Sequence, residues 1–191
     1  PRTETDFLDG EDGLSVTFTV PDGWGYWDSA PPYRGVYHLK PRRGRSNQLP
    51  PEMVRFFDVR NVYDVCKHVL VDPPVGPTVD DLVSAFANLP RLATTAAADI
   101  TVDGYVGKQI EFNVPSRFVA EECNASTFAL WQEVGDESGL QYSAAGNTHI
   151  QLWILDVGGT RLVIEANSYV STSPQERATI DEIVASIQIS Q

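Results

Sequence analysis

The sequence predicts an α+β fold in which a mostly antiparallel β-sheet is flanked by helices. Three observations support this prediction. Stretches that alternate apolar and polar residues outnumber helical stretches, and the helices fall between groups of strands. The last forty residues, Gln151–Gln191, read as a β-hairpin followed by a capped amphipathic helix. A chain of 191 residues is long enough to bury about 70% of its unfolded surface, so it can build a large core.

The N-terminal part divides into a tail and the start of the domain. Residues 1–12 are polar and acidic, which predicts a tail or linker before a single α+β domain over residues 13–191. Leu14–Val20 alternates strictly and predicts a half-buried strand. We expect a short strand at Gly35–Lys40 and another at Met53–Val59, with residues 61–77 irregular.

The middle and C-terminal parts carry clear helix signals. Thr78 and Asp81 form a capping-box pattern, which predicts a helix from there to about Leu89. Strands are expected at 100–105, 109–114 and 128–131, before the closing hairpin. Ser173 and Glu176 repeat the capping box for the last helix. The apolar face of this helix is formed by Ile180, Ile183, Val184 and Ile187. We expect it to pack on the hairpin residues Trp153, Leu155, Leu162 and Ile164.

Charge and hydropathy exclude several partners. Twenty-six acidic against fourteen basic residues give a net charge of −12, which argues against nucleic acid and against docking on anionic lipid. No apolar run approaches the roughly 18 residues of a membrane span, so we expect no membrane insertion by this segment.

The sequence carries no recognisable catalytic pattern. It has no serine nucleophile elbow and no phosphate-binding loop, and its three histidines are far apart in sequence and in no metal-ligand spacing. We therefore predict no catalytic residues, no bound metal and no cofactor. The two cysteines, Cys66 and Cys123, are compatible with one disulfide or with two buried thiols.

A cluster of aromatic residues between positions 24 and 37 is the feature of this sequence that indicates a binding surface. Trp27, Tyr33 and Tyr37 stand among prolines and glycines, where exposed rings could stack on a sugar, a peptide or a cell-wall fragment. The alternative is that the rings pack in the core, which we expect for Trp24. Trp27, Tyr33 and Tyr37 are thus the predicted ligand-binding residues.

Several stretches together resemble an uncharacterised family of exported actinobacterial domains. They are VTFTVPDGWG (16–25), DPPVGPTVDDLVSAFANLP (72–90), TVDGYVGKQIEFNVP (101–115), LWILDVGGTRLVIEA (152–166) and ERATIDEIVASIQI (176–189). The resemblance implies an extracytoplasmic domain, secreted or anchored by a membrane segment outside this sequence. It also implies that Cys66 and Cys123 are bonded to each other.

A looser resemblance is to the PsbP-like fold, which includes lipoproteins of the LpqN type. It depends on Pro21–Trp24 at the end of the first strand and on Ile183–Ile187 near the end of the last helix. It implies an antiparallel sheet sandwiched by helices, and no enzyme activity.

The functional hypothesis is a non-catalytic extracytoplasmic sensor or binding domain, which would engage an unknown small ligand or protein partner. The alternatives are a hydrolase whose active site assembles only in space, and a structural or assembly subunit.

Overall fold

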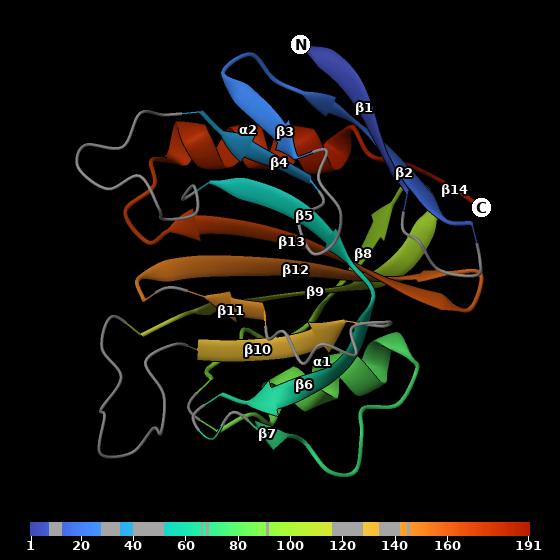
Figure 1. Ribbon diagram of the computed structural model, residues 1–191, viewed down its shortest axis with the longest axis vertical. Helices are drawn as coiled ribbons and strands as arrows, with labels where there is room; N and C mark the ends of the chain where they lie inside the picture. Colours follow the sequence, from blue (N-terminus) through green and yellow to red (C-terminus); the bar gives the residue numbers. More distant parts are fainter. Residues whose placement is uncertain are drawn as a thin grey trace.

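A seven-stranded sheet forms the centre of the computed structural model, which describes residues 1–7, 13–27, 35–39, 52–65, 67, 69–90, 92–115, 128–133, 142–144 and 146–191 (Figure 1). Its strand order is β3-β4-β5-β13-β12-β9-β8, and every neighbouring pair is antiparallel. The strands are β3 (Trp24–Trp27), β4 (Gly35–His38), β5 (Met53–Phe57), β8 (Ala98–Val102), β9 (Tyr105–Asn113), β12 (Thr148–Val157) and β13 (Thr160–Tyr169). The predicted fold class is confirmed.

Two smaller sheets flank the central one. One has the order β1-β2-β14, with β1 (Arg2–Phe7), β2 (Ser15–Val20) and β14 (Gln188–Ser190). The other has the order β11-β10-β6-β7, with β6 (Val59–Asp64), β7 (Val69–Leu70), β10 (Phe128–Glu133) and β11 (Tyr142–Ala144). Only Asp58 separates β5 from β6, so the chain passes from the central sheet into the second small sheet in one step.

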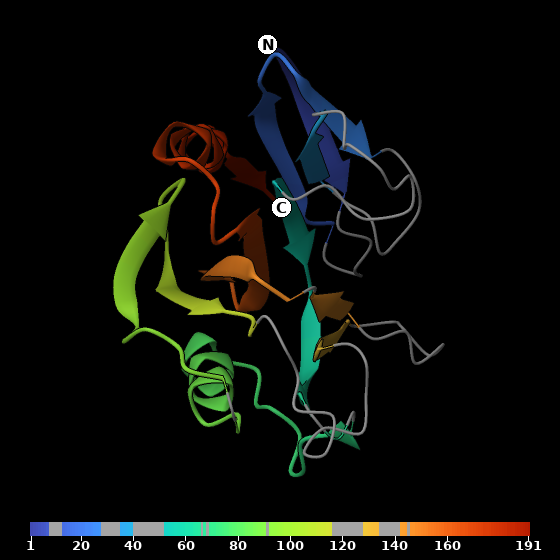
Figure 2. The same cartoon turned by 90° about the vertical axis from the view of Figure 1, so that its left-hand side faces the viewer.

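The two helices lie on opposite sides of the central sheet, at the top and bottom of Figures 1 and 2. They are α1 (Val79–Ala87) and α2 (Pro174–Ala185), and both begin with the predicted capping box. Neither is long and apolar enough to cross a bilayer, within the part of the chain that the structure describes. We refer below to the α1 face and the α2 face of the sheet.

Each face of the sheet has its own hydrophobic core, as the pleat of the strands requires. In β12, Ile150, Leu152 and Ile154 point to the α1 face. They pack with Leu82 and Phe86 of α1. The intervening residues of the same strand, including Trp153 and Leu155, belong to the core on the α2 face.

The packing predicted for the last helix is confirmed. Ile180, Ile183 and Val184 of α2 are buried on the α2 face, as is Ile187 just after the helix end, in one cluster with Trp153, Leu155, Leu162 and Ile164. The same core includes Val16 and Phe18 of β2 and Leu14, which precedes that strand.

Several sequence predictions differ from the structure. Residues 2–7 were expected in a tail, but they form β1 and pair with β2 from Arg2↔Val20 to Phe7↔Ser15. The region 61–77 was expected to be irregular, but it holds most of β6 and all of β7. The closing helix ends at Ala185, and residues 188–190 form a strand on β2. Residues 135–148 were expected to form a polar loop, but Tyr142–Ala144 within them form β11.

Candidate functional site

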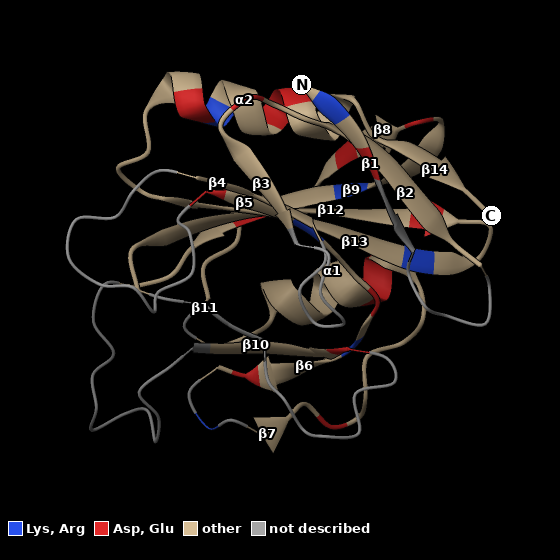
Figure 3. Cartoon of the chain, turned by 45° about the horizontal axis from the view of Figure 1, so that its top comes forward, with Lys and Arg blue, Asp and Glu red and all other residues tan. Residues whose placement is uncertain are grey.

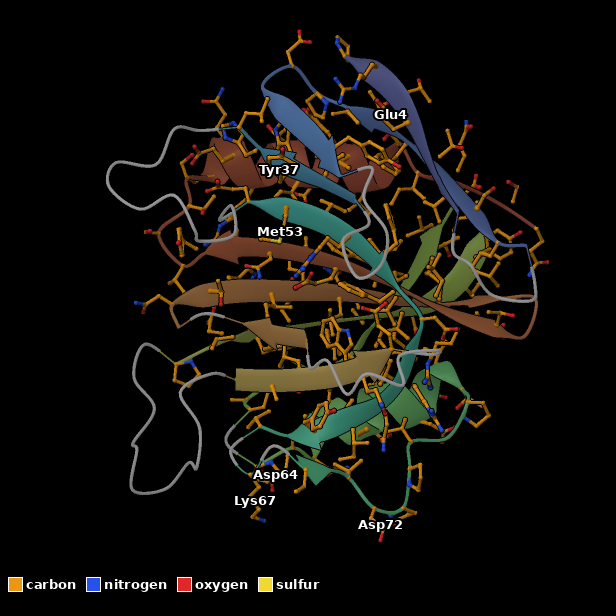
Figure 4. All side chains as sticks on the ribbon, viewed as in Figure 1. Glu4, Tyr37, Met53, Asp64, Lys67 and Asp72 are labelled. Atoms are coloured by element: carbon orange, nitrogen blue, oxygen red, sulfur yellow. The ribbon has the colours of Figure 1, made fainter. Side chains whose placement is uncertain are left out.

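The aromatic residues predicted to bind a ligand are only partly placed. Tyr33 and the side chain of Trp27 lie outside the described residues. Tyr37 lies on β4 (Figure 4), where it is half-buried and its ring covers Gly25 of the neighbouring strand. Trp24 is 4% exposed and part of the core on the α2 face, as expected. The structure thus gives Tyr37 a packing role and leaves the binding prediction untested.

The predicted cysteine pair also lies outside the described residues. Neither Cys66 nor Cys123 is described, so the disulfide stays a prediction. Within the described ranges no three His, Cys, Asp or Glu side chains gather as metal ligands.

A groove opens on the α1 face, beside the N-terminus of α1. Its volume is about 420 Å³. The β8–β9 hairpin and the β12–β13 hairpin form its other walls. The residues that line it are Pro77, Thr78, Val79, Asp80, Asp99, Val106, Gly107, Lys108, Asp156, Gly159 and Arg161.

The α1 wall of the groove is fixed by the capping box and by Arg161. The Thr78 hydroxyl accepts from the Asp81 amide, and Asp81 accepts from Thr78 in return. These hydrogen bonds lower the pKa of Asp81, so its carboxylate stays ionised. Arg161 donates to the carbonyl oxygens of Gly76 at 2.6 Å, Thr78 at 3.0 Å and Val59 at 2.6 Å. It therefore ties the helix entry to β13.

The opposite wall is fixed by the β8–β9 pair. Lys108 donates to Asp99, its cross-strand neighbour, and this hydrogen bond raises the pKa of Lys108. The position before it is glycine for a steric reason. A Cβ on Gly107 would lie 2.1 Å from the backbone oxygen of Ile154, so only glycine permits this close approach of β9 to β12.

The groove therefore presents more negative than positive charge. Lys108 is engaged by Asp99, and the head group of Arg161 is engaged by backbone oxygens. Asp80 and Asp156 line the same space, and Asp156 uses one oxygen to accept from the Gly159 amide. Figure 3 shows acidic positions at one end of α1 near a basic position of β13. A groove of this kind is suited to a ligand that carries a cation.

A second polar cluster lies on the α2 face. His149 is 3.0 Å from the Asn113 side-chain oxygen through Nδ1 and 3.5 Å from Glu111 through Nε2. Amides of Gln109 and Gln151 donate to the other oxygen of Glu111. Burial lowers the pKa of His149, and the Glu111 carboxylate partly opposes this shift. The imidazole is therefore held neutral over a wider pH range than in a free chain.

Sequence reasoning did not find the groove. Its residues come from five elements between positions 77 and 161 that meet only in the fold. The one available signal was the Thr78–Asp81 capping box, because it marks where a helix N-terminus would be. That signal indicates a helix, and it does not indicate a cavity.

Comparison with known proteins identifies the fold. No protein-family model matches the chain, and no curated protein matches its sequence. The chain has an LpqN-type fold. The crystal structure of LpqN, a Mycobacterium tuberculosis protein involved in cell envelope biogenesis, superposes with a TM-score of 0.50 at 11% identity over 100% of this chain and 91% of LpqN.

Two further structures are similar at lower scores. The PsbP of the cyanobacterium Synechocystis, CyanoP, gives a TM-score of 0.44 at 11% identity over 98% of this chain and 92% of CyanoP. A Bacteroides thetaiotaomicron protein gives 0.41 at 10% identity over 92% of this chain and 45% of its own. The resemblance to the LpqN type is confirmed at the level of the fold.

Proposed function

We propose that this protein is a non-catalytic binding domain that acts outside the cytoplasm, in a protein that another segment anchors to the membrane. The groove beside α1 is the proposed ligand site. The observation that carries the proposal is that four of the groove's five charged side chains are already held by structural partners, which gives a preorganised recognition surface; the four are Asp99, Lys108, Asp156 and Arg161.

The charge states of these groups favour binding over acid–base catalysis. A general acid or base works best when its pKa is near the ambient pH. Among the charged residues that line the groove, Lys108 has a pKa that its hydrogen bond to Asp99 raises further above neutrality. A group of this kind keeps its charge through the physiological range, which suits recognition better than proton transfer.

The extracytoplasmic location is supported by the fold and by the sequence resemblance. LpqN, which has the same fold, is involved in cell envelope biogenesis. The sequence motifs quoted above resemble exported domains. An acidic surface with a net charge of −12 suits a domain that stays in solution beside an anionic membrane.

The proposal is tested by mapping small-molecule fragments onto the ¹⁵N-labelled protein. We expect the amide signals of Val79, Asp80, Val106 and Lys108 to shift with more fragments than those of any other surface. The variant Val106→Glu provides the control, because Val106 is 66% exposed and its replacement changes the groove without opening the core. Fragments that gather elsewhere and ignore the groove would contradict the proposal.

One observation favours the hydrolase alternative. Nε2 of His149 lies 3.5 Å from the Glu111 carboxylate on the α2 face, and the pKa of His149 is lowered by burial. A neutral imidazole beside a carboxylate is a general-base arrangement. Hydrolysis of a panel of chromogenic esters by the wild type that is lost in His149→Gln would establish this alternative.

The aromatic segment remains a proposed second contact surface. Trp27, Tyr33 and Tyr37 are the proposed residues, with Tyr37 limited by its packing on Gly25. A loss of ligand binding in Trp27→Ala with an unchanged melting temperature would support this role. A lower melting temperature with unchanged binding would assign these rings to the core.

A further inference from the structure

Strand β8 forms one edge of the central sheet, and it lies directly beside the groove. It pairs with β9 along one side and is the last strand in the sheet order. Figure 2 shows it at the outside of the molecule, and the sheet order places β9 between it and β12. Its residue Asp99 is part of the groove lining. The edge and the groove are therefore one continuous surface.

The turn after β8 determines which backbone groups point away from the sheet. Asp103 and Gly104 have φ values of 48° and 83°, which is the pattern of a two-residue type I′ turn. Val102 and Tyr105 flank this turn and form a hydrogen-bonded pair. Because bonded and non-bonded pairs alternate, the N–H and C=O groups of Asp99 and Thr101 point to the open edge.

The side chains of β8 alternate between the two faces. Asp99 and Thr101 are exposed, and Asp99 is on the α1 face with Lys108. Ile100 and Val102 are half-buried and pack against the core of the α2 face. A strand added to this edge would extend the polar side chains on the α1 face and the apolar side chains on the α2 face. It would carry apolar side chains next to Ile100 and Val102 and polar side chains next to Asp99.

Charge complementarity selects a basic occupant. On the α1 face, a Lys or Arg side chain of an added strand would lie beside Asp99, which Lys108 contacts through Oδ1 alone, and would reach toward Asp80 at the start of α1. A second copy of this chain fits less well. Each copy carries a charge of −12, and antiparallel self-pairing centred on Ile100 would place Asp99 opposite Thr101 with no cation on either strand.

We propose that β8 binds an extended basic segment of a protein partner, which joins the sheet as an added strand and places Lys or Arg side chains over Asp99 at the mouth of the groove. This inference rests on the proposed function, since it names the class of ligand for the same site. Main-chain hydrogen bonds to Asp99 and Thr101 give the affinity, and the alternating side chains give the specificity.

The test uses the full 191-residue chain and fluorescein-labelled Thr-Val-Lys-Val-Lys-Val-Thr, followed by fluorescence anisotropy. A peptide with Glu in place of both Lys residues should bind at least about tenfold more weakly. Asp99→Asn should weaken binding of the Lys peptide by about two- to fivefold, the usual effect of one exposed ion pair.

Asp156→Asn is the matched control variant. It removes the same charge and keeps an oxygen for the Gly159 amide. Asp156 is on β12, three strand spacings of about 4.8 Å from the added strand, so its effect should be smaller than that of Asp99→Asn. Equal effects of the two variants would overturn the proposal.

Backbone methylation separates strand addition from simple charge attraction. Two peptides are made, each N-methylated at alternate residues, so that the two methylation patterns are complementary. One pattern blocks the edge that faces β8 and should abolish binding, whereas the other should bind within about twofold of the parent peptide. Equal binding of both methylated peptides, or equal binding of the Lys and Glu peptides, would refute strand addition.

The fragment map distinguishes this inference from the proposed function. If the peptides do not bind but fragments still gather in the groove, the basic-strand inference is wrong and the groove remains a ligand site. If neither binds there, both proposals are wrong.

Discussion

A buried ion pair between Arg55 and Glu165 offers the strongest prediction about stability. The two residues are cross-strand neighbours on β5 and β13, and they are 1% and 0% exposed. Nε and Nη2 of Arg55 both donate to the same oxygen of Glu165, at 2.9 and 2.8 Å. The guanidinium also lies 5.2 Å from the centre of the Phe57 ring. Burial raises the pKa of Glu165, and Arg55 opposes this rise.

Removing one partner should cost far more than removing both. Glu165→Leu leaves a buried guanidinium without its carboxylate, which costs about 3–5 kcal/mol of unfolding free energy. That is a large share of the 5–15 kcal/mol typical of a domain. The double variant Arg55→Met with Glu165→Leu leaves no charge at this site, so its unfolding free energy should lie near that of the wild type or be up to about 4 kcal/mol higher.

The assay is urea unfolding followed by tryptophan fluorescence for the wild type, both single variants and the double variant. Arg55→Met carries a further pH signature. With Arg55 absent, the folded-state pKa of Glu165 rises further above the unfolded value of about 4.3. The folded chain then keeps a proton that the unfolded chain loses, so stability falls as pH rises, by about 1.4 kcal/mol per pH unit. Single variants that each cost under about 1 kcal/mol, or additive effects in the double variant, would refute the reasoning.

Three further predictions concern the core, pH and the cysteines. Ile183→Ala should cost about 2–5 kcal/mol in urea unfolding, because it leaves a cavity between α2 and the sheet, and a change below about 1 kcal/mol would contradict this packing. The pKa of His149 is lowered in the folded state, so as pH falls the imidazole of the unfolded chain is protonated first. The free energy of unfolding should therefore decline below about pH 6.5, and His149→Gln should reduce this decline. Cys66 and Cys123 should give no thiol signal in the unreduced, unfolded protein, and two reactive thiols would show that the disulfide prediction is wrong.

Local signals in the sequence predicted much of the fold. The alternation of residues 14–20, both capping boxes and the closing hairpin each depend on neighbours within a few positions, and all are confirmed. Strand β1 was missed because RTETDF has no alternating apolar row. Its strand conformation comes from pairing with β2, which the residues of β1 do not encode by themselves.

Features that join distant parts of the chain could not be predicted. Arg55 and Glu165 are 110 positions apart, and only the register of β5 on β13 makes them neighbours. Gly107 was read as a boundary between two strands, because glycine is usually a breaker. It lies inside β9 because the close approach to Ile154 excludes any side chain. The groove likewise depends on contacts between elements that are far apart in the sequence, so it could not be predicted.

Amide hydrogen exchange at β8 tests the central claim most directly. In the free protein, Ile100 and Val102 should be protected by their bonds to β9, whereas Asp99 and Thr101 should exchange quickly because their amides point to the open edge. A saturating amount of the Lys peptide should slow exchange at Asp99 and Thr101 and leave Ile100 and Val102 unchanged. Fast exchange at Asp99 and Thr101 in the presence of bound peptide would contradict strand addition at this edge.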